Sequence, residues 1–253
     1  MNHTDINRQD VKRANRCFYD AVADQYEEID GRRSPAMEAW LRKNLLALKE
    51  RTGPGNFLDL GAGSGLAARC AKGIFKTIVG LDLSPGLLIQ NHHAFDLAVA
   101  ADVDHLPFSD QSFDVITSFA VLHHLYDYER LVSECSRILR PGGIFYSDHD
   151  MDVSFYKRFR IPLTVYRKYN DACERYRQAS VEVTRELYEL TEYHENGVDT
   201  NRILSRFEEA GLQVEKKFHW YGLHPVTDTM FGTRGLKQGW APVVSILATK
   251  AIV

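Results

Sequence analysis

The chain has 253 residues, of which 44% are hydrophobic and 26% charged, a composition typical of a globular protein with one large core. Its net charge of −3 provides no overall attraction to nucleic acid or to an anionic membrane. No apolar run reaches the roughly 20 residues that a membrane span requires, and the first residues lack a signal-peptide pattern, so we predict one embellished domain in the cytoplasm.

Up to residue 55, apolar residues are spaced as on one face of an α-helix. Apolar residues between Ile6 and Ile29 recur at three- and four-residue intervals and predict one or two amphipathic helices. Another helix is expected after Ser34-Pro35 and ends at Gly53-Pro54-Gly55. We predict that residues 1–55 form an N-terminal helical lid and that 56–253 form the main domain.

From Asn56 onward, short apolar strands alternate with helices. We expect strands at 56–60, 77–82, 97–102, 113–118 and 143–147, and helices that include 66–72, a segment starting at Pro85, and 125–139. This alternation predicts a parallel sheet covered by helices on both faces. Ligands of such α/β sheets lie beyond the carboxyl ends of the strands, where the polar site residues should therefore gather.

The alternation stops after residue 151. Aromatic and apolar residues at helical spacing predict a helical cap inserted at about 152–197. The expected elements after the cap are a helix at 200–210, strands at 214–221 and 243–249, and a glycine-bearing loop at 222–242 between these strands.

The stretch Phe57–Leu66 joins a strand, a glycine turn and a helix start. It contains Gly61, Gly63 and Gly65 in the pattern Gly-x-Gly-x-Gly. Glycines let a backbone turn sharply against a ligand, and a helix N-terminus offers N–H groups to polar atoms. The loop is therefore a candidate nucleotide site, although similar turns also join strands to helices without binding anything.

Carboxylates follow two of the expected strands. Asp82 lies 21 positions after Gly61, where an acid can accept hydrogen bonds from a ribose diol. Asp102 ends the third strand and can accept a hydrogen bond from an adenine amine, while Val103 or Leu106 covers the ring. Both acids thus point to one adenosine.

In chain order, these motifs resemble the class I S-adenosylmethionine-dependent methyltransferases. The matching pieces are Leu58–Gly65, Asp82, Asp102 before Leu106-Pro107-Phe108, Phe113–Ile116, His123-His124 and Leu139–Gly143. Residues 18–26 also look like the helix that closes over the cofactor in the ubiquinone/menaquinone-biosynthesis branch. The resemblance implies a Rossmann-like seven-stranded sheet of order 3-2-1-4-5-7-6 with strand seven antiparallel.

The resemblance also implies where S-adenosyl-L-methionine, and its product S-adenosyl-L-homocysteine, would bind. The ribose would lie on Asp82 and the adenine near Asp102, while Asp59 would face the methionine amino group, whose charge stabilises a buried carboxylate. The predicted cofactor-binding residues are Tyr19, Tyr26, Asp59, Gly61, Ala62, Gly63, Ser64, Gly65, Asp82, Leu83, Asp102, Val103, Leu106, Ser118, Phe119 and His123.

Histidines at strand ends are candidates for the general base that a phenol, amine or acidic carbon acceptor requires. We prefer His149, oriented by Asp148 or Asp150, over His124, which can simply pack under the following helix. A hydrogen-bonded loop histidine is the alternative interpretation of His149. We expect no metal, because Asp148-His149-Asp150 makes a poor cage and no two cysteines are closely spaced.

The cap mixes basic and aromatic residues, a pattern that also occurs on RNA-binding surfaces. Its helical spacing and compensating acids favour a solvated cap. We predict methyl transfer to an O, N or C atom of a small molecule, by a monomer or homodimer. The alternatives are an RNA methyltransferase of the same fold, a cofactor-binding protein without catalysis, and an NAD-dependent oxidoreductase, which fits less well because the third glycine falls one position early.

Overall fold

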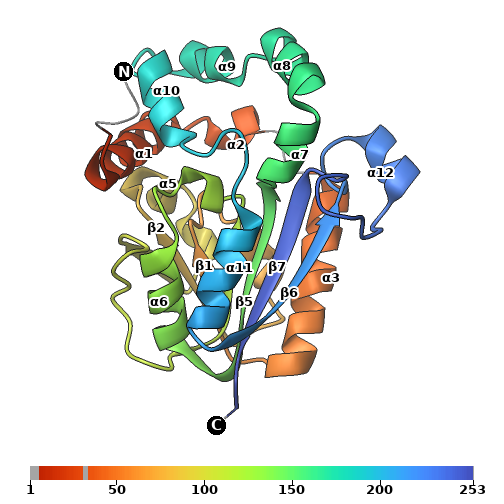
Figure 1. Ribbon diagram of the computed structural model, residues 1–253. Coiled ribbons are helices and arrows are strands. Elements are labelled where there is room, and N and C mark those ends of the chain that lie inside the picture. Colours follow the sequence, from red (N-terminus) through yellow and green to blue (C-terminus); the bar gives the residue numbers. More distant parts are fainter. Residues whose placement is uncertain (1–5, 31–33, 253) are drawn as a thin grey trace.

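A seven-stranded sheet with helices on both faces forms the centre of the molecule (Figure 1). The computed structural model describes residues 6–30 and 34–252, so parts of the predicted lid, at 1–5 and 31–33, lie outside the described residues. The strands are β1 (Asn56–Leu60), β2 (Thr77–Asp82), β3 (Leu97–Ala100), β4 (Phe113–Phe119), β5 (Leu139–Met151), β6 (Leu212–His219) and β7 (Val243–Lys250). Their order is β3-β2-β1-β4-β5-β7-β6, and β7 is antiparallel to both of its neighbours. The predicted sheet is confirmed.

Side chains alternate between the two faces of the sheet, as the strand repeat requires. Along β1, Phe57 packs in one buried cluster and Leu58 in the other. The first of these clusters includes α3 (Pro35–Thr52) and α4 (Leu66–Ala71), and the second includes α6 (Glu129–Ile138) and α11 (Thr200–Glu209). Helices on both faces leave the carboxyl ends of the parallel strands as the edge where a ligand can enter.

Local capping sets where the first helices begin. Asn7 and Asp10 form a reciprocal capping box at the start of α1 (Arg8–Val22). Ser34 caps α3 by accepting from the Met37 amide, and Pro35 occupies the first turn, where its missing N–H costs nothing. Three short helical elements, α2 (Tyr26–Asp30), α5 (Pro85–Gln90) and the 3₁₀ turn η1 (His92–Ala94), complete the first half of the chain.

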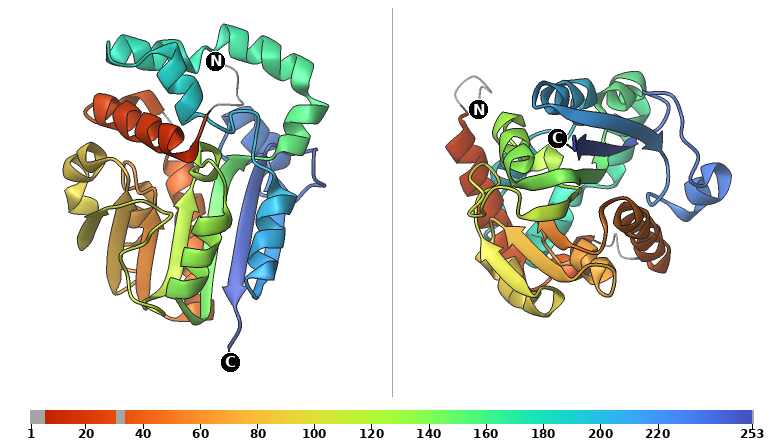
Figure 2. Two further views of the ribbon diagram at one scale, coloured as in Figure 1. Left: turned by 60° about the vertical axis from the view of Figure 1, so that its left-hand side comes forward. Right: turned by 90° about the horizontal axis from the view of Figure 1, so that it is seen from below.

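The predicted lid divides into two parts. α1 lies over the carboxyl ends of the strands, whereas α3 packs on a face of the sheet and belongs to its core (Figure 1). The cap consists of α7 (Val153–Arg158), α8 (Arg160–Tyr169), α9 (Ala172–Ala179) and α10 (Arg185–Thr191). Phe18 and Val22 of α1 form a small buried cluster with Tyr176 and Val183 of the cap. α1 and the cap therefore lie together over one end of the sheet (Figure 2).

The fifth strand is longer than predicted. The expected strand ended at Ser147, but β5 continues to Met151, so Asp148, His149 and Asp150 lie within the strand instead of following it. The pairing with β7 shifts register between Ser147 and Asp150, and His149 has a left-handed φ of 68°. This irregularity is typical of a β-bulge, which redirects a side chain locally.

Other boundaries also differ from the predictions. β3 ends at Ala100, which leaves Asp102 in the following turn, and the helix expected at 125–139 is α6, preceded by the 3₁₀ turn η2 (Leu122–His124). The loop expected at 222–242 contains α12 (Pro225–Phe231), which Pro225 initiates. Among the described residues, none of the helices is both long and apolar enough to cross a membrane.

Candidate functional site

A cavity lies at the carboxyl ends of β1, β2 and β4, between the glycine loop and α1. The predicted site residues that line it are Tyr19, Tyr26, Asp59, Gly61, Ala62, Gly63, Ser64, Asp82, Leu83, Asp102, Val103, Phe119 and His124. The predicted residues outside its lining are Gly65, Leu106, Ser118, His123, Asp148 and His149. Thus most of the cofactor candidates share one cavity, whereas His124 is the one catalytic candidate that reaches it.

The glycine loop bends in a way that only glycine tolerates well. Gly61 and Gly63 have φ values of 65° and 48°. A side-chain carbon built on Gly61 would come within 2.6 Å of Val121, so a methyl group there has no space. The Gly63 amide donates to Asp82 Oδ2 at 2.8 Å, which ties the loop to the end of β2.

Asp82 is buried and fixed by backbone amides. Besides Gly63, the Ser84 amide donates to its other oxygen, Oδ1, at 2.8 Å. Burial raises the pKa of Asp82 to about 6, although these amide bonds act in the opposite direction. Each carboxylate oxygen retains a further lone pair, so the group can also accept hydroxyl groups from a ligand in the cavity.

Asp59 is the other desolvated acid of the cavity. Its oxygens accept from the Ala68 amide and the Thr117 hydroxyl, each at 3.1 Å. Burial is the largest influence and raises the pKa of Asp59 to about 7. A cationic ligand group beside Asp59 would lower that pKa and stabilise the charged form, so the site suits an ammonium group.

Ion pairs connect α1 to the loops that follow β3 and β4, at the end of the cavity away from the glycine loop. Arg8 pairs with Asp104 at 2.7 Å and also with Asp127. Lys12 pairs with both Asp102 and Asp104. Lys12 Nζ donates to Asp102 Oδ2, and the Asp104 amide donates to Asp102 Oδ1 at 2.9 Å, so both oxygens of this acid already accept a hydrogen bond.

Three segments meet at His124, which bridges α1 and the cap. Its Nδ1 lies 2.8 Å from the carbonyl oxygen of Thr191, and its Nε2 lies 2.8 Å from the Tyr19 hydroxyl. Because a carbonyl only accepts, Nδ1 carries the proton, and the Tyr19 hydroxyl donates to Nε2. The Asn15 amide group also donates to the His124 carbonyl at 3.3 Å.

His149 is not brought to the cavity. Its ring stacks on the Phe119 ring, with the two centroids 4.5 Å apart. Phe119 lines the cavity, whereas the His149 side chain lies behind it and is only 2% exposed. Asp148 lies in a buried network with Tyr146, His219 and Ser245. Burial opposes the charge on Asp148, but the two neighbouring histidines hold its pKa well below the usual value.

The other predicted residues outside the lining have structural positions. Leu106 packs in a core cluster, Ser118 is buried, and Gly65 caps the start of α4 in a left-handed conformation. The Nδ1 atom of His123 lies 2.7 Å from Asp150 Oδ1.

Several lining residues were missed from the sequence. They are Arg8, Val11, Lys12, Asn15, Leu66, Ala67, Ser84, Leu87, Asp104, Ala120, Val121, Leu125, Tyr126 and Asp127. The residues of α1 among them carried no motif, since a basic residue on an amphipathic helix is ordinarily a solvated one. Ser84 and Val121, by contrast, lie in the loops just after β2 and β4 and could have been included on that ground.

The fold and the cavity define an α/β protein whose glycine loop and strand-end acid suit an adenosine-containing ligand. Residues 58–147 match the family model described as "Methyltransferase domain". This part of the chain is therefore similar to the methyltransferase domain.

Relatives agree with this assignment. A protein of Mycolicibacterium smegmatis named as a probable S-adenosylmethionine-dependent methyltransferase is 30% identical over 68% of this chain and 64% of the relative. A demethylmenaquinone methyltransferase of Mycobacterium marinum is 33% identical over 50% of this chain and 54% of the relative. The chain thus spans less than two thirds of each of these relatives.

A solved structure matches at the level of the fold. It is the magnesium protoporphyrin IX methyltransferase of Synechocystis with bound S-adenosylhomocysteine, at 11% identity, a TM-score of 0.60, and coverage of 96% of this chain and 100% of that one.

Proposed function

We propose that this protein transfers a methyl group from S-adenosyl-L-methionine to a small molecule. The observation that carries the proposal is the single cavity that contains the glycine loop, the desolvated Asp59 and the backbone-tied Asp82. In this proposal the ribose hydroxyls donate to Asp82, and the methionine ammonium lies at Asp59. The adenine lies at the α1 end, near Asp102 and Val103.

Binding and orientation are sufficient for much of the chemistry, because the sulfonium methyl is already activated. The acceptor must approach in line with the carbon–sulfur bond, in a site from which water is excluded. Tyr19 and His124 border the cavity between α1 and the cap, and we propose that the Tyr19 hydroxyl oxygen, which His124 holds in place, accepts a hydrogen bond from the acceptor. We propose that His149 and Asp148 instead support Phe119 from behind.

Aromatic residues favour a flat acceptor. Tyr19, Tyr126 and Phe119 all line the cavity, and aromatic faces pack well on planar rings. The M. marinum relative carries the name of a quinone-related substrate. We therefore propose an aromatic or quinone-like acceptor. We also propose that the protein acts in the cytoplasm, as a monomer or homodimer, and does not bind nucleic acid.

A labelled-methyl assay tests the transfer. The full chain is incubated with methyl-labelled S-adenosylmethionine and a panel of hydroxylated aromatic compounds, and label in the organic phase is counted. Transfer to at least one compound is expected. The protein could instead bind the cofactor without transferring label to this panel or to a fractionated cell extract. That result would contradict a methyltransferase activity and favour a cofactor-binding protein without catalysis.

A further inference from the structure

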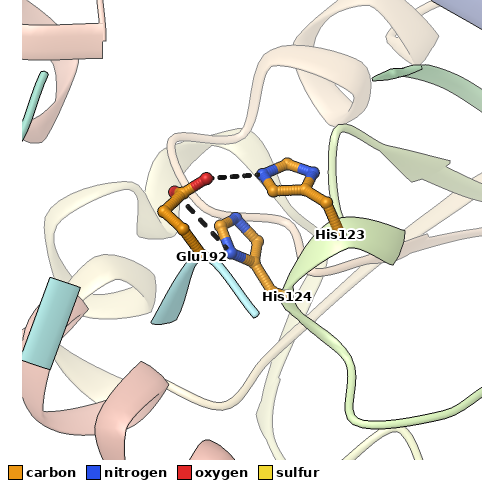
Figure 3. A group of neighbouring side chains, drawn as sticks. All are labelled: His123, His124 and Glu192. Carbon is orange, nitrogen blue, oxygen red and sulfur yellow. Dashed lines mark ion pairs between the residues drawn. The ribbon is translucent and has the colours of Figure 1, made fainter. Parts of the chain in front are cut away.

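Two histidines and a cap glutamate converge beside the cavity (Figure 3). His123 and His124 are consecutive in η2, and Glu192 follows α10. His123 Nε2 lies 3.5 Å from Glu192 Oε2, and His124 Nδ1 lies 3.9 Å from Glu192 Oε1. One nitrogen from each ring and one carboxylate oxygen all lie within 4.8 Å of one another. The three side chains are only 12%, 12% and 18% exposed.

Hydrogen bonding determines which His123 nitrogen faces Glu192. Asp150 is fully buried and accepts from the His123 amide at 3.1 Å and from the Leu122 amide at 3.3 Å. The same carboxylate lies 2.7 Å from His123 Nδ1, so Nδ1 carries a proton and donates it there. The Nε2 lone pair of a neutral His123 then points toward a carboxylate, an arrangement that requires a positive charge between them.

Both rings are held from behind in the manner of metal-binding histidines. Histidine ligands usually use one nitrogen for the metal and hydrogen-bond the other to a fixed partner. Here Asp150 accepts from Nδ1 of His123, and Nε2 of His124 lies 2.8 Å from the Tyr19 hydroxyl. The Thr191 carbonyl, 2.8 Å from His124 Nδ1, adds an oxygen donor beside the same point. A metal on His124 Nδ1 would displace the proton donated to this carbonyl, and the neutral ring would then carry its proton on Nε2 and donate it to the Tyr19 hydroxyl oxygen.

The distances suit a small divalent cation. Zinc binds imidazole nitrogen and carboxylate oxygen at about 2.0–2.2 Å, which sets tetrahedral ligand atoms roughly 3.4 Å apart. The separations of 3.5 and 3.9 Å involve the two different oxygens of Glu192, and the ligand atoms all lie within 4.8 Å of one another, so binding requires the carboxylate and the rings to move inward. Imidazole ligands favour zinc and similar transition metals over magnesium or calcium.

We propose that His123, His124 and Glu192 bind a divalent transition-metal cation of the zinc type at the acceptor end of the cavity. Two histidines and one carboxylate leave a coordination position open, as catalytic zinc sites do. Because His124 also lines the cavity, the open position serves an oxygen of the acceptor. The site depends on residues from η2 and the cap, and the sequence motif of two adjacent histidines did not predict it.

The proposed metal also indicates what kind of acceptor the site suits, an inference that rests on the proposed function. A hydroxyl group that coordinates the cation loses its proton to water more readily. The resulting oxygen attacks the sulfonium methyl, the new bond joins oxygen to carbon, and the carbon–sulfur bond breaks with its electron pair on S-adenosylhomocysteine. The metal site therefore favours an acceptor with an ionisable oxygen, such as a phenol.

Zinc titration of the full chain, freed of metal with a chelator, tests the site by calorimetry. We expect one tight equivalent of zinc per chain. Glu192→Gln and His123→Gln should each weaken this binding by at least 100-fold while circular dichroism and the melting temperature stay near the wild-type values. S-adenosylhomocysteine binding, measured in the same metal-free samples, reports on the cofactor site separately.

Two control variants exclude binding elsewhere. Glu195→Gln removes an acid of the same loop that pairs with Arg167, and His93→Gln removes one of two adjacent exposed histidines. Both controls should retain the tight equivalent. The absence of stoichiometric zinc binding, its survival in Glu192→Gln, or its loss in His93→Gln would overturn the proposal and leave His123 as a protonated bridge between Asp150 and Glu192.

Discussion

The two ends of the cavity are built in different ways. At the glycine-loop end, Asp59, Gly63 and Asp82 lie within a short stretch of chain and are fixed by backbone amides. At the cap end, Tyr19, His124 and a glutamate at 192 come from three distant segments and are joined by side-chain contacts. The first end follows from local strand-and-turn geometry, whereas the second depends on how α1 and the cap pack together.

In the proposed function, the glycine-loop end binds the cofactor and the cap end binds the acceptor, so the two ends have different tasks. A cofactor shared by many enzymes can be held by one strand–turn–helix unit, because its shape does not change from one enzyme to the next. An acceptor differs between enzymes, and we propose that its site lies where α1 and the cap meet. Substitutions at the two ends should therefore affect different measurements.

Gly61→Ala should have the largest effect at the glycine-loop end. The added methyl group meets Val121 at 2.6 Å, and φ is 65°, so the loop must shift where the cofactor is proposed to bind. Gly73→Ala is the matched control, because Gly73 has φ 74° and open space around it. We expect at least a 100-fold loss of S-adenosylhomocysteine affinity in Gly61→Ala, measured by calorimetry, and little change in Gly73→Ala. Equal affinities would contradict the role of this loop.

Asp82→Ala removes the proposed ribose contact. Loss of charged hydrogen bonds typically costs about 1.5–3 kcal/mol, or roughly 10- to 100-fold in affinity. Asp110→Ala, at an exposed residue paired with Arg137, serves as the control and should bind normally. Unchanged binding in a folded Asp82→Ala protein would place the ribose elsewhere.

Asp59→Asn should change the stability of the free protein and its cofactor affinity in opposite directions, and the stability change should depend on pH. The folded-state pKa of Asp59 is raised to about 7, so the folded form holds its proton more tightly than the unfolded chain does. Its contribution to stability therefore falls as pH rises from about 4 to about 7. The non-titrating variant should be more stable than wild type at pH 8, by about 1–2 kcal/mol after relaxation around the buried charge.

This stability difference should shrink as the pH is lowered below 7, and thermal unfolding of both proteins across pH 5–8 measures it. The same variant should bind S-adenosylmethionine more weakly, because it has lost the charge opposite the ammonium group. A variant less stable than wild type at pH 8 would show that the Asp59 charge is compensated in the free protein.

Lys12→Gln should have the smallest effect. Lys12 pairs with Asp102 and Asp104, and ion pairs that are partly exposed contribute about 0–1 kcal/mol each. We expect cofactor dissociation to accelerate by a few-fold, and wild-type dissociation to accelerate likewise as salt rises, in stopped-flow measurements. Arg13→Gln, which removes an exposed pair with Asp10, is the control. Slower dissociation in Lys12→Gln would show that these pairs do not hold α1 closed.

The sheet and the glycine-loop end could be predicted because their information is local. Alternating strands and helices predict a parallel sheet, and the glycine loop with acids at strand ends predicts a shared cavity. The strand order followed from the resemblance to the methyltransferases. Leu106 and Ser118 lie outside the cavity lining. Leu106 packs in a core cluster, and Ser118 lies within β4, where successive side chains point to opposite faces.

The cap end could not be predicted, because tertiary packing determines it. His149 follows an apolar strand, so it was expected at the cavity edge, but β5 continues through it and a bulge directs its ring behind Phe119. His124 gains its partners from α1 and the cap, which no local pattern indicates. The pairs between Lys12 and the acids after β3 likewise join residues about 90 positions apart.

Calorimetric titration of the wild-type protein with S-adenosylmethionine, S-adenosylhomocysteine and NAD tests the central claim most directly. In the proposed binding mode, Asp59 faces an ammonium group that both sulfur compounds carry and NAD lacks. We predict one equivalent of each sulfur compound bound and no measurable binding of NAD. Binding of NAD alone would contradict the assignment of this cavity to the methyl donor.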